Sequence, residues 1–330
     1  MKRRDFITLL GGAVAAWPLA AHAQQPMPVV GFIGGGFWGT GDGSGGNHFV
    51  EAFRSGLREM GFIEGQNVAI EYRFAENRLE GLPELVADLI RRRVAVICTG
   101  NNVTTLAVKK ATSEIPLVFV FGLDPVLMGL VSTINRPGGN ATGVSFLTSS
   151  LEPKRLELVR VLLPQAELVA ALVNPDNPNA ESHIKDLQAA TGTFGMQLFV
   201  LKLREVSDFE TTFATLVQQR VGAVLVTSDS LFDSNRRRLV DLAARNAIPA
   251  MYPWRDFADA GGLLSYGNSL NDAARHVGLY AGRILKGDKA GDLPVWVPTK
   301  FEFILNLKTA KALGLEIPAK LLAFADEVIE

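Results

Sequence analysis

Short apolar runs alternate along the chain with segments whose apolar residues recur every three or four positions. The runs predict buried strands, and the spaced segments predict helices that cover a sheet. In the first half, strands are expected at 28–33, 68–74, 94–98 and 117–121, and helices at 48–60, 82–92 and 103–112. Strands that alternate with helices in this order form a parallel sheet with helices on both faces.

The same order of elements returns in the second half. Strands are expected at 168–173, 197–202, 223–226 and 250–252, and helices at 180–193, 209–219 and 233–246. Residues repeat too, because an Ile-Pro pair enters corresponding strands at 115–116 and at 248–249. The sequence therefore predicts an α/β fold with two similar doubly wound lobes, each built on a parallel sheet.

The two lobes are expected to be interleaved. The turn-rich segment 136–143 and the short strand expected at 144–146 mark the first crossing between them. A strand at 261–266, a helix at 272–285 and a strand at 301–305 remain after both repeats, so the chain must return to each lobe. We expect lobe 1 at 28–145 and 263–297, and lobe 2 at 146–262 and 298–330. A hinge of several crossings would let the lobes open and close.

The first 24 residues predict an export signal. Basic residues at positions 2–4 precede an apolar run that is shorter than the ~20 residues of a membrane span, and Ala21-His22-Ala23 predicts cleavage after Ala23. Arg3-Arg4 resembles a twin-arginine signal, although the general secretory route stays open. Gln24 follows the cut, so no lipid anchor is expected. These features predict a soluble periplasmic protein with no membrane insertion after cleavage.

Composition narrows the possible functions. The 330 residues include 33 Lys and Arg and 34 Asp and Glu, and this balance argues against a nucleic-acid partner. The one cysteine, Cys98, ends a predicted buried strand and excludes an intramolecular disulfide or a cysteine zinc site. Histidines 48, 183 and 276 lie on separate predicted helices without metal-ligand spacing. We therefore predict no catalytic site, no metal and no cofactor.

The predicted ligand site is the cleft between the lobes, because ligands of open α/β sheets bind at the carboxyl ends of the strands. The loops there offer short hydrogen-bonding groups and aromatic rings, which suit an amino acid or another small polar or aromatic solute. The candidate ligand-binding residues are Phe37, Trp38, Thr99, Asn101, Asn102, Asp124, Ser145, Asn174, Asn177, Thr227, Asp229, Tyr252 and Tyr266. Asn, Asp, Ser and Thr also occur at helix caps and turns for purely local reasons.

Charge pairing suggests a role for some of these candidates. Asp124 or Asp229 could pair with a ligand ammonium group, and the helix starts beside Asn102 and Asn177 could hold a carboxylate. The glycine-rich loop 34–46 lacks the Gly-Lys-Ser/Thr ending of a P-loop, and no acidic residue ends the next strand. We interpret this loop as a lip of the cleft rather than a dinucleotide site.

Several segments together carry a resemblance to a known family. They are 122–126, 129–131, 136–145, 261–267, 283–287, 298–302 and 306–315, including Gly122-Leu123-Asp124-Pro125-Val126. Over essentially all of the mature chain, the protein resembles ABC transporter substrate-binding proteins of the type I periplasmic fold. That family includes tryptophan- and tyrosine-binding members. The first loop is longer and richer in glycine than the family pattern, so contacts made there cannot be carried over.

The resemblance implies two lobes, a hinge with three crossings, and capture of a small ligand for the transmembrane subunits of an ABC permease. It favours Asp124, Ser145, Asn174 and Asp229 as cleft residues. Our main hypothesis is a periplasmic solute-binding protein that closes on its ligand. Two alternatives stay open at this point: an exported α/β enzyme, and a ligand-sensing subunit of a membrane receptor.

Overall fold

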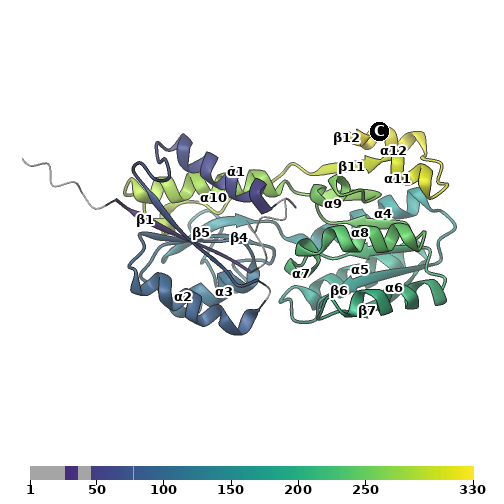
Figure 1. The fold of residues 1–330 in the computed structure, drawn as a ribbon, viewed down its shortest axis with the longest axis horizontal. Helices are drawn as coiled ribbons and strands as arrows, with labels where there is room; N and C mark the ends of the chain where they lie inside the picture. Colours follow the sequence, from purple (N-terminus) through teal and green to yellow (C-terminus); the bar gives the residue numbers. More distant parts are fainter. Residues whose placement is uncertain (1–26, 36–45, 77) are drawn as a thin grey trace, which may run out of the picture.

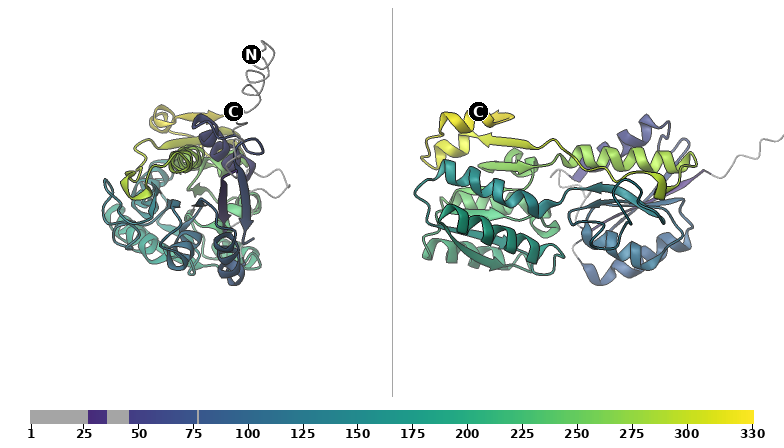
Figure 2. Two further views of the ribbon diagram at one scale, coloured as in Figure 1. Left: turned by 90° about the vertical axis from the view of Figure 1, so that its left-hand side faces the viewer. Right: turned by 180° about the vertical axis from the view of Figure 1, so that it is seen from behind.

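The computed structural model describes residues 27–35, 46–76 and 78–330. The predicted export signal and the two aromatic candidates Phe37 and Trp38 lie outside the described residues. Two α/β lobes lie side by side, and the C-terminal elements belong to the second lobe (Figures 1 and 2). Within the described residues, no helix is long and apolar enough to cross a membrane.

The described part of lobe 1 contains a parallel five-stranded sheet in the order β2-β1-β3-β4-β5. Its strands are β1 (Val29–Gly34), β2 (Ala69–Phe74), β3 (Val96–Thr99), β4 (Leu117–Phe121) and β5 (Ala141–Ser145). Its helices are α1 (Gly46–Glu59), α2 (Leu82–Arg91), α3 (Asn102–Ala111) and α10 (Leu270–Leu285), with 3-10 turns at Leu79–Gly81 and Ala290–Asp292. Helices α1 and α10 cover one face of this sheet, and α2 and α3 cover the other (Figure 1).

The described part of lobe 2 contains a seven-stranded sheet in the order β12-β11-β10-β9-β8-β6-β7, in which only β10 and β11 pair antiparallel. Its strands are β6 (Leu168–Val173), β7 (Gln197–Lys202), β8 (Ala223–Val226), β9 (Ala250–Tyr252), β10 (Leu264–Gly267), β11 (Glu302–Asn306) and β12 (Glu327–Ile329). Its helices are α4 (Glu152–Leu162), α5 (Ala180–Phe194), α6 (Asp208–Gln218), α7 (Ser230–Ser234), α8 (Arg236–Arg245), α9 (Arg255–Asp259), α11 (Leu307–Ala312) and α12 (Ala319–Phe324), with a 3-10 turn at Thr148–Leu151. The prediction of two α/β lobes is confirmed.

Three details of the predicted layout are wrong. The expected lobe boundary at 263 assigns β10 to lobe 1, yet β10 pairs with β9 and β11 in the lobe 2 sheet. The strand expected at 144–146 is β5 (Ala141–Ser145), which pairs along its whole length with β4, so the first crossing begins after Ser145 and not at the turn-rich segment 136–143. The helix expected at 233–246 is divided at Asn235 into α7 and α8. Which strands pair depends on how the whole sheet assembles, so the hydrophobic pattern of a single segment does not predict its partners.

Within the described residues the chain crosses between the lobes after β5, after β10 and before β11. The first and third crossings lie side by side. Ser145 N donates to Trp296 O at 3.0 Å, and Trp296 N donates to Gly143 O at 2.8 Å. Segments joined in this way form one hinge instead of independent linkers.

Helix α10 follows the second crossing and is attached to lobe 1 by close packing against α1. A Cβ atom at Gly56 would lie 2.0 Å from the Arg275 carbonyl oxygen, and one at Gly278 would lie 2.1 Å from the Phe53 carbonyl oxygen. Only glycine allows the two backbones to approach so closely. An ion pair between Arg275 and Glu59 adds to this contact at the surface.

A buried polar cluster lies next to the hinge in lobe 2. The Glu152 carboxylate accepts from Arg155 Nη1 at 2.9 Å and contacts His183 Nδ1 at 2.7 Å. Arg155 Nε donates to the carbonyl oxygen of Tyr266 at 2.8 Å, immediately before the second crossing. Because α4 follows the first crossing, this cluster joins two of the hinge segments inside lobe 2.

The thiol of Cys98 is fully buried in β3, as the sequence predicts. Burial raises the pKa of the Cys98 thiol, so almost none of it is thiolate at neutral pH. We expect the native protein to leave a thiol reagent such as dithionitrobenzoate unreacted, and the urea-unfolded protein to consume one equivalent. Rapid labelling of the native protein would show that β3 is accessible in solution.

Candidate functional site

The candidate site is a cleft where the carboxyl ends of strands from both sheets face each other. An inner chamber of about 60 Å³ receives side chains from both lobes, and a larger cavity of about 370 Å³ adjoins it. Both are lined by Asn101, Val103, Asn177, Asp229 and Ser230. The inner chamber has room for only a few water molecules, so a solute of amino-acid size would have to widen it.

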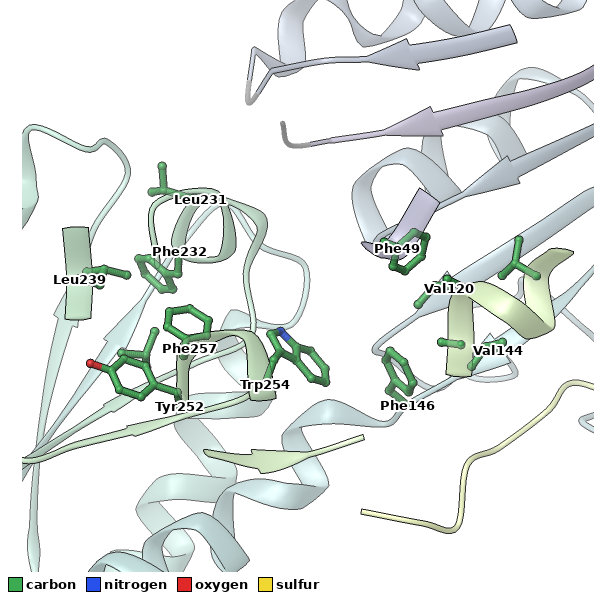
Figure 3. Packing of buried hydrophobic residues seen from close by; sticks show 14 of the residues in the cluster. Phe49, Val120, Val144, Phe146, Leu231, Phe232, Leu239, Tyr252, Trp254 and Phe257 are labelled. Carbon is green, nitrogen blue, oxygen red and sulfur yellow. The ribbon is translucent and has the colours of Figure 1, made fainter. Parts of the chain in front are cut away.

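Two aromatic rings face each other across the inner chamber. Phe146 directly follows β5 at the first crossing, and Trp254 follows β9 in lobe 2. Their ring centroids are 5.5 Å apart at an interplanar angle of 47°, and both side chains are buried (Figure 3). The pair therefore supplies a flat apolar surface beside the polar side chains of the chamber.

The lobe 1 side of the chamber is built around the start of α3. Asn101 caps this helix, since its Oδ1 accepts from Thr104 N at 2.9 Å. Its Nδ2 reaches across the cleft and donates to Ser230 Oγ at 3.0 Å. Asn102 Oδ1 accepts from Gly122 N at 2.7 Å and so holds the end of β4 beside the helix. Asn101 thus contributes to both the site and the contact between lobes.

The lobe 2 side is organised by Asp229, which caps α7. Its Oδ1 accepts from Leu231 N at 2.8 Å and from Asn174 Nδ2 at 3.1 Å, and its Oδ2 accepts from Asn177 Nδ2 at 2.7 Å. Burial raises the pKa of Asp229, although the two asparagine amides and the Leu231 N–H oppose that effect. Asn177 Nδ2 also donates to Ser228 O at 2.9 Å. The structure thus brings together three sequence candidates, Asn174, Asn177 and Asp229.

Two further candidates are buried behind the cleft. Thr99 Oγ1 lies 2.6 Å from Thr105 Oγ1, and Thr227 Oγ1 donates to the Leu172 carbonyl oxygen at 2.8 Å. Both threonine side chains have no more than 1% of their surface exposed. Neither lines one of the two cavities described above, so their hydroxyl groups support the loops that carry Asn101 and Asp229.

The structure places Asp124 and Ser145 outside both cavities. Asp124 Oδ1 accepts from Val126 N at 2.8 Å and from Leu127 N at 3.1 Å, as expected for an aspartate at the start of a turn. Ser145 is fully buried in the hinge, and its hydroxyl donates to the Leu123 carbonyl oxygen at 3.2 Å.

The two tyrosine candidates also lie away from the cavities. Tyr252 is 1% exposed and stacks on Phe257 at a centroid distance of 4.7 Å in the core of lobe 2 (Figure 3). Tyr266 stacks on Phe301 at 5.8 Å. Tyr252 belongs to β9 itself, whereas Trp254 lies beyond the end of that strand and lines the chamber.

Phe146, Trp254 and Asp233 line the inner chamber but are absent from the sequence candidates. Phe146 follows an apolar strand and is easily interpreted as part of the core, and Asp233 falls at the start of an expected helix. The sequence could have identified Trp254 as a cleft residue, because it lies just past the end of a predicted strand. Within the described residues, no group of His, Cys, Asp or Glu is arranged to hold a metal ion.

Comparisons with known proteins agree with this architecture. The family model described as ABC transporter substrate binding protein matches residues 42–329. A tyrosine-binding protein of Clostridioides difficile (strain R20291) is 25% identical over 266 residues, which are 81% of this chain and 76% of that protein.

Solved structures show the same fold. A domain from Streptococcus pneumoniae in complex with L-Trp has a TM-score of 0.82 and 22% identity, covering 92% of this chain and 99% of that chain. The ligand-free, open structure of a substrate-binding protein with adhesive properties from Clostridium difficile has a TM-score of 0.64 and 23% identity, with the same coverage of both chains.

Proposed function

Because the chain belongs to the ABC transporter substrate-binding protein family, we propose that it captures a small solute between its lobes and delivers it to an ABC permease. A family of substrate-binding proteins carries solutes and does not convert them, so the exported-enzyme alternative is set aside. The observation that carries the proposal is the inner chamber, because it is formed by both lobes together. A ligand held there contacts both lobes only when they are closed, and it therefore favours closure.

The lining residues favour a solute with a flat apolar part and several hydrogen-bonding groups. Phe146 and Trp254 would contact the flat part, while Asn101, Asn177 and Ser230 offer donors and acceptors beside it. Aromatic amino acids are the first candidates, since one relative is described as tyrosine-binding and one similar structure contains L-Trp. The candidates Asn102, Asn174 and Asp229 fit this use by holding the polar groups in place.

Export and closure complete the proposed function. A twin-arginine signal at the N-terminus would carry the chain to the periplasm, with cleavage after Ala23. The hinge would let the lobes separate, and the permease would recognise the closed form. The chain superposes better on the L-Trp complex than on the open, ligand-free structure, which supports a closed arrangement of the described lobes.

A thermal-shift screen of amino acids, aromatic acids and sugars tests the proposal. A solute present at 100 times its Kd should stabilise the protein by about 2.7 kcal/mol. Small-angle scattering should show a smaller radius of gyration when that solute is added. Tight binding without compaction would contradict the closure mechanism, and the absence of any binder would contradict solute capture.

The hydrogen bond between Asn101 and Ser230 gives a second test, because it joins the lobes directly. We expect Ser230→Ala to weaken ligand binding by about fivefold, since a neutral hydrogen bond contributes about 1 kcal/mol. Titration calorimetry of both single variants and the double variant would measure the coupling. Thr211→Ala, at an exposed position of α6, is the control and should leave Kd unchanged. Additive effects of Asn101→Ala and Ser230→Ala would show that this bond does not form in the liganded state.

A further inference from the structure

Two residues that line the inner chamber each have a buried side-chain atom without a hydrogen-bond partner among the described residues. The atoms are Oδ1 of Asp233, on α7, and Nε1 of Trp254, whose side chain is 4% exposed. Both residues line the inner chamber. The Trp254 indole lies near enough to the Asp233 carboxyl group to lower its pKa, but it forms no hydrogen bond with Oδ1. Since buried polar atoms gain stability by pairing, a hydrogen-bonding group of a bound solute could pair with both residues.

Asp233 differs in this respect from the nearby Asp229. Both oxygens of Asp229 accept hydrogen bonds from protein donors, which are the Leu231 backbone and the amides of Asn174 and Asn177. Asp229 is therefore already satisfied by its own loop. Asp233 Oδ1 receives no hydrogen bond of this kind from the described residues, although the Trp254 indole lies near the carboxyl group.

The surroundings of Asp233 are acidic. The carboxyl groups of Asp229 and Asp256 lie close enough to affect its ionisation, and Arg236 is the nearby basic group. Arg236 Nη1 donates to the Asp233 backbone carbonyl at 2.9 Å, not to its carboxylate. Among the described residues that line the inner chamber there is no lysine or arginine.

This environment disfavours the charged form of Asp233. Burial raises its pKa well above the ordinary value, and the negative charges of Asp229 and Asp256 raise it further, while Arg236 and the Trp254 indole oppose them. Burial also raises the pKa values of Asp229 and Asp256. A cation bound beside Asp233 would favour the charged form of this carboxyl group, which the protein alone disfavours.

We propose that Asp233 determines ligand specificity by accepting a hydrogen bond at Oδ1 from a protonated nitrogen of the solute. The aromatic part of that solute would lie against Phe146 and Trp254. This inference rests on the proposed function and narrows it to aromatic amines and aromatic amino acids. Aromatic carboxylic acids without the nitrogen place no cation at Asp233 and bring a further negative charge into an acidic chamber.

Titration calorimetry with two matched series tests the assignment. The series are tyramine, L-tyrosine and 4-hydroxyphenylacetate, and tryptamine, L-tryptophan and indole-3-acetate. We expect wild-type protein to bind the nitrogen-containing members of at least one series at least 50-fold more tightly than the matching acid. Asp233→Asn should weaken their binding at least tenfold. Wild-type affinity should rise with pH and release a proton on binding, and Asp233→Asn should lose both effects.

Two controls separate a specificity role from a folding defect. Asp256→Asn changes a neighbouring carboxyl that does not line the chamber, and it should alter Kd less than twofold. Asp233→Asn should raise the unfolding midpoint of the ligand-free protein at neutral pH, because a carboxyl group whose pKa is raised by burial costs folding free energy there and an amide does not. Loss of binding together with a lower midpoint would overturn the assignment.

The remaining outcomes distinguish this inference from the proposed function. If the acids bind as tightly as the amines, or if Asp233→Asn leaves affinity unchanged, the role of Asp233 is wrong while solute capture stands. If none of the six compounds binds, the proposed aromatic solute is wrong, and the specificity role of Asp233 is overturned with it.

Discussion

Arg155→Met is expected to destabilise the protein by about 3–5 kcal/mol, because it leaves a buried carboxylate without its main partner. Both Arg155 and Glu152 have fully buried side chains, and their ion pair is 2.9 Å long. Burial alone would raise the pKa of Glu152, but the Arg155 guanidinium and His183 outweigh it and hold that pKa below its usual range. Methionine keeps most of the side-chain volume of arginine. The loss of stability would therefore come from the unpaired Glu152 charge and not from a cavity.

Urea unfolding measures this loss, and the neighbouring Lys154→Met is the matched control. Lys154 pairs with Glu157 on the same helix, but both side chains are 42% exposed. Exposed pairs contribute about 0–1 kcal/mol, so the control should change stability little. Replacing both Glu152 and Arg155 with methionine should recover much of the loss, since no charge then remains unpaired. Equal effects of Arg155→Met and Lys154→Met would contradict a role for the buried pair.

The same variant should reverse the pH dependence that Glu152 contributes. With its folded pKa lowered, Glu152 stabilises the wild-type protein above pH ~4.5, and this contribution is lost as pH falls through the lowered value. In Arg155→Met, burial should raise the folded pKa instead, so acidification toward pH ~4.5 should recover stability. Subtracting the pH dependence measured for the double methionine variant removes the contribution of the other carboxyl groups to the free energy of unfolding.

Gly278→Ala is expected to destabilise the protein by about 2–3 kcal/mol through overpacking between α1 and α10. The added Cβ would lie 2.1 Å from the Phe53 carbonyl oxygen, which is backbone and cannot rotate away. The two helices would have to separate. Because α10 connects the second crossing to lobe 1, ligand affinity should fall together with stability.

Gly192→Ala is the matched control for this substitution. Gly192 also lies in a helix, α5, but a Cβ atom there meets nothing within 4 Å. Alanine is the better helix former, so this variant should gain about 0.5–1 kcal/mol. Thermal and urea unfolding of both variants give the comparison. If Gly278→Ala is as stable as Gly192→Ala, the close approach of α1 and α10 does not hold in solution.

Some of the candidate site could be predicted from single loops. Asn101 and Asp229 cap helices that begin just after strands, so position along the chain was enough to put them at the cleft. The same reasoning selected Asp124, whose carboxylate instead accepts backbone N–H groups of its own turn. Sequence alone cannot distinguish these cases, because a local cap and a cleft residue share the same residue types and positions.

Other parts of the site depend on contacts between distant segments. Phe146, just after β5, meets Trp254, just after β9, only when the two lobes come together, and Asp233 on α7 lines the same chamber. The buried contact between Arg155 and the Tyr266 carbonyl joins residues 111 positions apart. No local pattern reports such contacts, since each side chain follows the rules of its own element until the lobes assemble.

The sequence by itself determined the alternation of strands and helices, the two similar lobes and the burial of Cys98. These follow from hydrophobic periodicity, which acts within each element. Only the tertiary structure decided that β10 pairs with β11 in lobe 2, and that Phe146, Asp233 and Trp254 share one chamber. Sheet partners and cleft walls are set by the packing of segments far apart in the chain, and that packing is a property of the whole fold.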